Sequence, residues 1–240
     1  MQILITGATS GIGNDLAKQY AKQGHKVTAC GRSAAKLQQL CSDYPSIESL
    51  CFDLTDYQNY PQVSEDFAPL DLLILNAGDC EYIDDALNFD AEKFERVINI
   101  NLISVGYSLQ TWLKHIKPGG RLVLVSSSAA LLPLPRAEAY GASKAALTYL
   151  AKTLTTTLSG NNINVTVVHP GFVKTPLTNK NTFAMPMMIS SQQAAEKIIT
   201  GVAKGRSDIS FPALFIFIMK CLSILPSSLW NKLATRMSEK

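Results

Sequence analysis

The segment TGATSGIG, at residues 6–13, follows a short apolar run at 3–5 and precedes a helical pattern of apolar residues that continues to Gly24. A strand, a glycine-rich turn and a helix in this order are typical of a dinucleotide-binding unit. The glycines let the chain reverse, let the backbone approach a pyrophosphate and let the helix pack closely on the strand. The N–H groups at the start of the helix would then face the phosphates. The predicted nucleotide-binding residues are Gly7, Thr9, Ser10, Gly11, Ile12 and Gly13.

Compact apolar runs alternate with helix-length segments along the rest of the chain. The further strand candidates are residues 27–30, 49–52, 72–75, 122–125 and 165–168, and the longest helical segments between them are 91–116 and 141–158. Strands that are apolar on both faces and separated by helices are typical of a parallel sheet covered on both sides. The pattern predicts an α/β fold with a doubly wound, Rossmann-like parallel sheet. Because no linker or repeat interrupts it, we expect one domain over residues 1–240.

Composition narrows the class of protein. The chain has 240 residues, 47% of them apolar, and a formal net charge of +3, which excludes a disordered protein and does not favour nucleic acid as a partner. The five cysteines form no CxxC pair and the three histidines are widely spaced, so we expect neither a disulfide framework nor a metal site. No secretory leader is evident before the first strand, and we expect a cytoplasmic protein.

Further short motifs follow the glycine turn in order. They are Asp53-Leu54, Asn76-Ala77-Gly78, Asn101, Ser127, the run YGASK at residues 140–144 and Pro170-Gly171. With the GxxxGxG spacing of the turn, they resemble the short-chain dehydrogenase/reductase family in its compact single-domain branch, up to about Thr175. The resemblance implies hydride transfer between a nicotinamide cofactor and a ketone, aldehyde or secondary alcohol. It also implies a homodimer or homotetramer.

The same resemblance implies a catalytic group. Tyr140 and Lys144 lie four residues apart in a helical segment, so both side chains emerge from one face. Tyr140 would exchange a proton with the substrate oxygen, and Ser127, thirteen residues earlier, would hydrogen-bond that oxygen. The ammonium group of Lys144 would lower the pKa of the phenol and bind the nicotinamide ribose. Asn101 would position a water that relays protons; the alternative is a polar residue that kinks its helix.

The resemblance also extends the cofactor site beyond the glycine turn. Asp53 would accept a hydrogen bond from the adenine amino group, and Leu54 would supply the neighbouring backbone N–H. The segment after the sixth strand would contact the carboxamide. The residues implied to line the cofactor are Asn76, Ala77, Gly78, Tyr140, Lys144, Pro170, Gly171, Val173 and Thr175.

The end of the second strand predicts which nicotinamide cofactor is bound. An acidic side chain there would bind the ribose hydroxyls of NAD and repel the 2′-phosphate of NADP. Gly31 stands where NAD-preferring members of the family carry Asp, Arg32 can hold a phosphate, and Ser33 can add a hydroxyl. NADP(H) is therefore favoured. Against it, Ser10 stands where many NADP-preferring members carry a basic residue, and Arg32 can also be read as a solvated surface charge.

Two segments after the last strand candidate carry separate expectations. Residues 175–190, rich in Thr, Asn, Pro and Met, are predicted to form a substrate lid, with a plain surface loop as the alternative. The apolar C-terminal extension, residues 211–240, starts with a run at 211–219 that is too short to span a bilayer. Since apolar residues occupy both faces of that helix, we expect it to be covered by protein, closing the substrate pocket or forming a subunit interface.

The alternative for this extension is a helix lying in a membrane surface, with Trp230, Lys232 and Arg236 near the headgroups. Peripheral membrane contact is thus an open but less favoured expectation.

The function favoured by these residues is an NADPH-dependent carbonyl reductase or alcohol dehydrogenase acting on a small, hydrophobic substrate. One alternative is an NAD-preferring dehydrogenase that works oxidatively. The other is a non-catalytic protein that senses NADP. The presence of Ser127, Tyr140 and Lys144 together disfavours a sensor, because a sensor needs no proton donor beside the nicotinamide.

Overall fold

A computed structural model describes residues 1–64, 67–181 and 183–238 of the chain. Thr182 in the predicted lid, residues 239–240 of the C-terminal extension and the side chain of Arg236 lie outside the described part.

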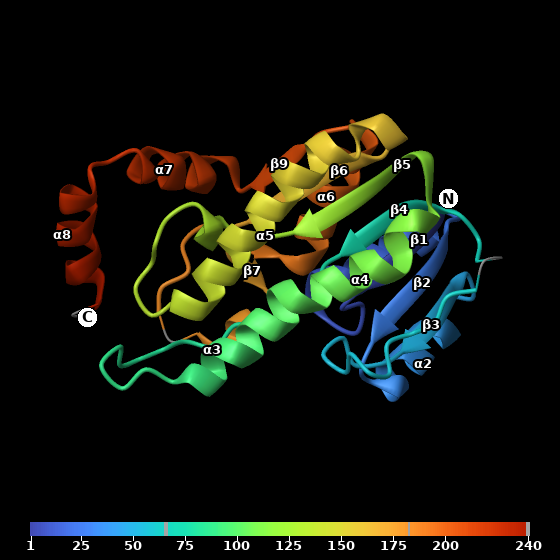
Figure 1. Ribbon diagram of the computed structural model, residues 1–240, viewed down its shortest axis with the longest axis horizontal. Helices are drawn as coiled ribbons and strands as arrows, with labels where there is room; N and C mark the ends of the chain where they lie inside the picture. The colour runs from blue at the N-terminus through green and yellow to red at the C-terminus, as the bar shows by residue number, and fades with distance from the viewer. Residues whose placement is uncertain (65–66, 182, 239–240) are drawn as a thin grey trace.

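Parallel strands form a seven-stranded sheet in the order β3-β2-β1-β4-β5-β6-β9 (Figure 1). Their bounds are β1 (Gln2–Thr6), β2 (Lys26–Gly31), β3 (Ile47–Cys51), β4 (Leu70–Leu75), β5 (Ile116–Val125), β6 (Asn164–Pro170) and β9 (Asp208–Phe211). The strand order reverses between β1 and β4, and open parallel sheets bind ligands beyond the carboxyl ends of the strands at such a point. The predicted doubly wound Rossmann-like sheet is confirmed.

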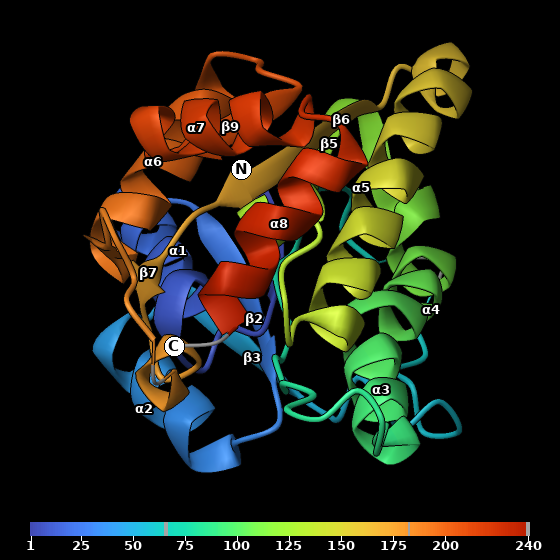
Figure 2. The same ribbon diagram turned by 90° about the vertical axis from the view of Figure 1, so that its left-hand side faces the viewer.

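Helices cover both faces of this sheet (Figure 2). One face carries α1 (Gly11–Lys22), α2 (Ala34–Asp43) and α6 (Ser191–Ala203); the other carries α4 (Ser104–Trp112) and α5 (Glu138–Thr157), with α3 (Ala91–Ile98) leading into α4. Side chains of successive strand residues point to opposite faces, and this divides the core in two. Ile3 and Ile5 pack with Leu16 of α1, whereas Leu4 packs on the side of Trp112.

The prediction of one continuous helix at 91–116 is wrong. The segment is interrupted by a π-helical turn at Asn99–Ile103, and the 3₁₀ turn η2 (Leu113–His115) then leads directly into β5 at Ile116. Asn101, in the wide turn, is fully buried and hydrogen-bonded to neighbouring segments. A π-helical turn at a buried polar residue frequently marks a functional site.

Several strand boundaries also differ from the prediction. The third strand covers Ile47–Cys51 rather than 49–52, and β5 begins six residues before the predicted 122. The early part of β5 contains Pro118, Gly119 and Gly120 and joins β4 through a register shift, so it carries no apolar signature. The edge strand β9 was not predicted, because its four residues alternate polar and apolar side chains.

The described elements within the predicted lid segment are short. Strand β8 (Ile189–Ser190) pairs with β7 (Val173–Lys174), which lies just before the lid, and the 3₁₀ turn η5 (Thr178–Lys180) lies between them. The turns η3 (Ser128–Ala130) and η4 (Ser159–Asn161) complete the described elements before the C-terminal helices.

The C-terminal extension forms α7 (Ala213–Ser223) and α8 (Ser227–Ser238), which lie beyond the carboxyl ends of the strands (Figure 1). Ile216 and Met219 of α7 are buried, and Trp230 of α8 is buried with its indole N–H donating to the carbonyl of Pro133. On the opposite face of α7, Phe217 is 65% exposed, so the described chain covers only one face of this helix and the expected cover by a second subunit stays a prediction. None of the described helices is long and apolar enough to cross a membrane.

Candidate active site

The glycine turn connects β1 to α1 in a conformation that suits a phosphate. Gly7 and Gly11 have φ values of +68° and +54°, a region that glycine adopts without strain. Ser10 precedes α1, and the described residues supply no side-chain cap for the helix. Because the first N–H groups of a helix need an acceptor and its N-terminus carries partial positive charge, an anion is the complementary ligand. The residues present therefore fit the pyrophosphate of a dinucleotide.

Gly13 fixes the distance between α1 and the sheet. A Cβ at this position would lie 2.3 Å from the carbonyl oxygen of Gly7 and 2.5 Å from Nδ2 of Asn76. That amide nitrogen donates to the carbonyls of Thr6 and Gly7, at 3.1 and 3.4 Å, and so ties the end of β4 to the end of β1. Only a glycine leaves this junction undisturbed.

We expect Gly13→Ala to lower the free energy of unfolding by about 1–3 kcal/mol, the usual range for overpacking a close contact. Thermal unfolding should then shift by about 2–4 °C for each kcal/mol. Gly106→Ala in α4 is the matched control, because among the described residues no atom lies within 4 Å of a Cβ added there. That control should be neutral or stabilising. A melting temperature of Gly13→Ala equal to that of the parent would contradict the close approach.

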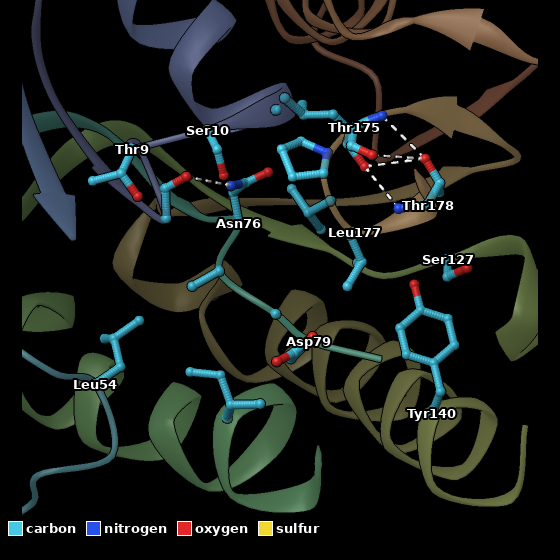
Figure 3. A pocket seen from close by; sticks show the side chains of 18 of the residues that line it. Thr9, Ser10, Leu54, Asn76, Asp79, Ser127, Tyr140, Thr175, Leu177 and Thr178 are labelled. Carbon is cyan, nitrogen blue, oxygen red and sulfur yellow. Dashed lines mark hydrogen bonds between the residues drawn. The ribbon is translucent and has the colours of Figure 1, made fainter. Parts of the chain in front are cut away.

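A cleft of about 470 Å³ runs from the glycine turn past the ends of β4, β5 and β6 (Figure 3). Most of the predicted site residues line it. They are Gly7, Thr9, Ser10, Gly11, Ile12, Arg32, Leu54, Asn76, Ala77, Gly78, Ser127, Tyr140, Lys144, Pro170, Gly171, Val173 and Thr175. Four others lie outside the described lining: Gly13, Ser33, Asp53 and Asn101.

At the end of β2, Arg32 reaches the carboxylate of Asp53, with Nη1 and Oδ2 3.4 Å apart. Asp53 also accepts hydrogen bonds from the N–H and hydroxyl of Thr55, at 2.8 and 2.7 Å. Ser33, predicted to face the cofactor, accepts from the N–H of Lys36 and caps α2. Asp53 and Ser33 thus hydrogen-bond to residues close to them in the chain. Arg32 is the cation that lines this end of the cleft.

Close packing explains why residue 31 is a glycine, and the sequence alone did not reveal this packing. A Cβ on Gly31 would lie 2.5 Å from the Cγ2 methyl of Thr9, a residue of the glycine turn. An aspartate at this position would therefore require the side chain of Thr9 to move.

The side chains of Tyr140 and Ser127 lie close to each other at the other end of the cleft (Figure 3). Ser127 follows β5 and accepts from the N–H of Ala129 at 3.1 Å, which starts η3 and orients the hydroxyl. Burial raises the pKa of Tyr140 to about 12, and a hydrogen bond from Ser127 opposes this rise. The phenol is therefore protonated at neutral pH.

Lys144 lies one turn further along α5 and is buried. Its Nζ donates to the carbonyl of Val125 at 3.0 Å and lies 5.8 Å from the centre of the Tyr140 ring. Burial lowers the pKa of this ammonium to about 8. Burial of the phenol prevails in the pKa of Tyr140, and Nζ of Lys144 is directed to a backbone carbonyl, so a lowering of that pKa by Lys144 stays a prediction.

Behind this pair, polar side chains hold the backbone of Lys144 in place. The hydroxyls of Ser126 and Thr148 both donate to its carbonyl, each at 2.9 Å, and lie 2.8 Å from each other. Nε2 of His169 is 3.3 Å from the Thr148 hydroxyl. All three are buried. The sequence offered no sign of this network, since the three residues come from β5, α5 and β6.

Asn101 joins three segments from its place in the π-helical turn. Its amide donates to the carbonyl of Asp79 and to the hydroxyl of Ser143, at 2.8 and 2.9 Å, and its Oδ1 accepts from the N–H of Asp79 at 2.8 Å. A Cβ on Gly78 would lie 2.9 Å from that Oδ1 and 3.2 Å from Nζ of Lys144. These contacts agree with the alternative of a polar residue that distorts its helix, and its role in a proton relay stays a prediction.

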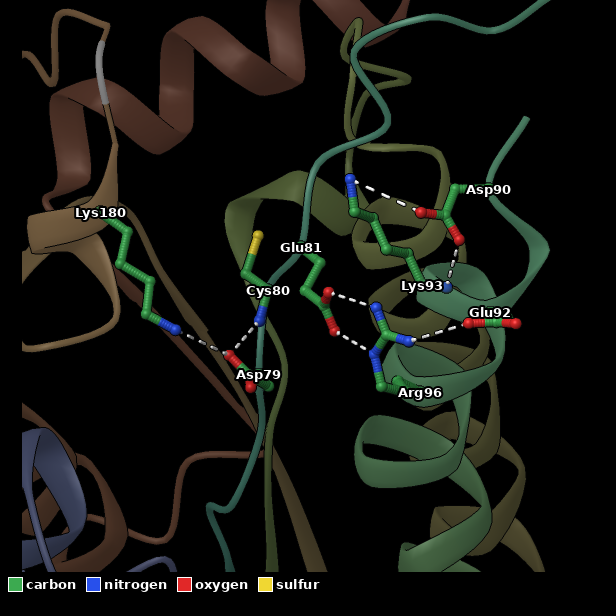
Figure 4. Close-up of polar contacts among 8 residues, drawn as sticks. All are labelled: Asp79, Cys80, Glu81, Asp90, Glu92, Lys93, Arg96 and Lys180. Atoms are coloured by element: carbon green, nitrogen blue, oxygen red, sulfur yellow. Dashed lines mark hydrogen bonds and ion pairs between the residues drawn. The ribbon is translucent and has the colours of Figure 1, made fainter. Parts of the chain in front are cut away.

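Ion pairs tie the segment after β4 to its neighbours along the rim of the cleft (Figure 4). Glu81 accepts two hydrogen bonds from Arg96 of α3, at 3.0 and 2.8 Å, and this pairing lowers the pKa of the carboxyl. Lys180 of η5 lies 3.9 Å from Asp79. The first pair joins the segment to α3 and the second joins it to the predicted lid.

The lid segment contributes further residues that sequence reasoning missed. Pro176, Leu177 and Thr178 line the cleft. The Thr178 hydroxyl accepts from the N–H of Thr175 at 3.0 Å and donates to the carbonyl of Val173 at 2.7 Å, closing a tight turn. The recurrence of Thr three residues after Thr175 was the available signal.

Comparisons with known proteins agree with this geometry. A family model described as short chain dehydrogenase matches residues 1–185. The chain is similar to an "Uncharacterized oxidoreductase" of Myxococcus xanthus (strain DK1622), with 31% identity over 98% of this chain and 96% of the relative. It is also similar to "Carbonyl reductase [NADPH] 2" of Sus scrofa, with 33% identity over 74% of this chain and 73% of the relative. A solved structure titled "short chain dehydrogenase/reductase family protein" has a TM-score of 0.79 at 24% identity, covering 88% of this chain and 95% of that one.

Proposed function

The chain belongs to the short-chain dehydrogenase/reductase family, whose members are oxidoreductases with a nicotinamide cofactor, and from this premise we propose that it is an NADPH-dependent carbonyl reductase. The substrate would be a ketone or aldehyde, and the reverse reaction would use a secondary alcohol. The observation that carries the proposal is that the side chains of Tyr140 and Ser127 line the same cleft as the glycine turn. The direct test is oxidation of NADPH in the presence of a panel of ketones and aldehydes.

The residues divide the work on the substrate oxygen. When bound, the nicotinamide cofactor supplies or accepts a hydride at the carbonyl carbon. Negative charge then builds on the oxygen, where Ser127 donates a hydrogen bond and Tyr140 delivers its proton. Because the pKa of Tyr140 is raised to about 12, the phenol holds its proton at neutral pH, which suits reduction better than oxidation.

Lys144 acts on the phenol after the proton has moved. Its ammonium, 5.8 Å from the ring centre, is the cation placed to stabilise the phenolate that remains. With a pKa of about 8, this group is still largely charged at neutral pH. Asn101 would act as a positioning residue that holds the backbone at Asp79 beside the cleft, with the proton relay as a further role. Residues 175–190 would form the substrate lid.

The choice of NADP(H) over NAD(H) rests on Arg32 and Gly31. Arg32 is 70% exposed in its side chain and can turn from Asp53 to a 2′-phosphate. Gly31 lacks the carboxylate that would select NAD, and a side chain there would crowd the Cγ2 methyl of Thr9. The printed name of the Sus scrofa relative, a carbonyl reductase of NADPH, supports the same choice.

We expect Arg32→Ala to weaken NADPH binding about 10- to 100-fold and to leave NADH binding unchanged, because a charge-assisted hydrogen bond contributes about 1.5–3 kcal/mol. Binding of both cofactors is measured by the fluorescence of the reduced nicotinamide. Lys36→Ala is the matched control, since Lys36 is an exposed cation nearby on α2 that does not line the described cleft. Equal affinities of the parent protein for NADPH and NADH would instead favour the alternative of an NAD-preferring dehydrogenase.

A further inference from the structure

One face of α7 presents a continuous apolar surface to solvent. Leu214, Phe217, Ile218 and Cys221 follow helical spacing of three and four residues and lie on one side of the helix. The three large side chains are 59%, 65% and 41% exposed, Cys221 is exposed, and Ile224 just beyond the helix is 81% exposed. We call these five residues the outer face of α7. Contiguous exposed apolar surface of this kind marks an interaction site.

The opposite face of α7 is already occupied, which fixes the helix on the protein. The ring of Phe215 packs on Phe172, with centroids 5.4 Å apart, and Met219 is buried with Leu132 and Trp230. A Cβ on Gly171 would lie 2.8 Å from the Phe215 ring, so the packing is close. The outer face therefore cannot turn inward to complete the core, and what covers it must come from outside the described chain.

Cations outnumber carboxylates in and beside the C-terminal helices. Residues 208–240 contain Lys220, Lys232, Arg236 and Lys240 against Asp208 and Glu239, and Asp208 is close enough to Lys220 for their charges to interact. Lys220 and Lys232 are exposed, with Lys220 on α7 itself. An apolar helix face bordered by cations is the pattern of a helix that lies in the interface of an anionic membrane.

We propose that the outer face of α7 is a docking surface for an anionic lipid bilayer, with the helix lying in the plane of the interface. A second copy of the chain fits this surface less well. In a two-fold contact the same patch meets itself, so the excess of cations in this region would face the same excess on the second copy. Anionic headgroups supply the missing charges, and the acyl region accepts the apolar side chains.

Docking of the outer face of α7 on a bilayer would also determine where the cleft lies relative to the lipid. Because Phe215 on the inner face of α7 packs against Phe172, and Gly171 lines the cleft, a docked helix would hold the substrate end of the cleft close to the bilayer. Figure 2 shows α7 and α8 together at this end of the molecule. Apolar carbonyl compounds concentrate in such a layer.

The test is flotation of the full chain with vesicles. We expect the protein to float with vesicles of phosphatidylcholine containing phosphatidylserine, and markedly less with phosphatidylcholine alone. Phe217→Asp should lower the partition coefficient about tenfold or more, because the variant loses a buried phenyl group and gains a negative charge. Lys220→Gln and Lys232→Gln should each lower it about fivefold on the anionic vesicles, the fold-change of about 1 kcal/mol per cation.

Leu87→Asp is the matched control, since Leu87 is 97% exposed and lies before α3, outside the C-terminal helices. It should float like the parent. Reduction of a water-soluble carbonyl compound checks that Phe217→Asp is folded, and it should be unchanged.

Absence of flotation of the parent with anionic vesicles would overturn the proposal, as would equal losses in Leu87→Asp and Phe217→Asp. Sedimentation without lipid tests the alternative that a second copy of the chain covers the outer face. A lower oligomeric mass for Phe217→Asp than for the parent would assign the outer face to a subunit contact instead.

Discussion

Replacement of Tyr140 by Phe is expected to lower kcat/KM for carbonyl reduction by about 10²–10⁴-fold, the range that a positioned general acid contributes. The ring is kept, so the packing around α5 should survive, and only the proton donor is lost. Burial and the hydrogen bond from Ser127 hold this hydroxyl at the cleft, and the described structure has no second phenol among the residues that line it. Water is a poor replacement, because it must enter a site that keeps Lys144 buried.

The measurement is steady-state oxidation of NADPH with the best carbonyl compound of the panel. NADPH binding, followed by fluorescence, is the control and should stay within about threefold of the parent, less than a typical hydrogen bond contributes. Turnover of the variant at a tenth of the parent rate or more would show that another group donates the proton. If the parent protein binds NADPH but turns over no carbonyl compound, the alternative of a non-catalytic protein that senses NADP is favoured.

Much of the fold was predictable because the decisive signals are local. Strand, turn and helix around Gly7 and Gly11 are set by adjacent residues, and the interval from Ser127 to Tyr140 places both at one end of the sheet. Parallel strands buried on both faces also leave continuous apolar runs, which β4 and β6 display clearly. Strands without that pattern, such as β9 and the first half of β5, were the ones missed.

What the sequence could not supply depends on contacts between distant segments. Whether Ser33 faces a cofactor or caps α2 is decided by the position of the Lys36 N–H, and both choices have the same sequence. The direction of the pKa shift of Tyr140 depends on how deeply the phenol is buried relative to its distance from Lys144. The apolar run at 211–219 gave the total hydrophobicity of α7, but only the packing of Phe215 shows which face is left exposed.

The polar residues at the end of β5 depend both on local sequence signals and on contacts between distant segments. Sequence spacing selects Ser127, and the structure adds that the adjacent Ser126 points to the backbone of Lys144 rather than to the cleft chemistry. Alternation along an extended strand end explains the division, because neighbouring side chains point to opposite sides. Consecutive serines at 126, 127 and 128 therefore have separate environments that single substitutions can distinguish.

Ser127→Ala is expected to lower kcat by about 10²–10³-fold, the effect of removing one donor to a developing oxyanion. It should also alter the pH dependence in one direction only. The hydrogen bond from Ser127 lowers the pKa of Tyr140, so its loss lets that pKa rise further above about 12. Alcohol oxidation needs the phenolate and should therefore require a higher pH than in the parent, whereas carbonyl reduction needs the phenol and should keep its profile near neutrality.

Ser128→Ala is the matched control for this experiment. Ser128 is equally buried, and its backbone carbonyl rather than its side chain accepts from the N–H of Leu131 in η3. The control should retain activity within about threefold, because removing a hydroxyl without a donor role costs less than a typical hydrogen bond. Rates in both directions are measured for the parent and the two variants between about pH 6 and about pH 10, a range centred on the Lys144 pKa of about 8. A large loss in Ser128→Ala with little change in Ser127→Ala would move the oxyanion donor by one residue. An alcohol-oxidation rate in Ser127→Ala equal to that of the parent throughout this pH range would show that Ser127 does not influence Tyr140.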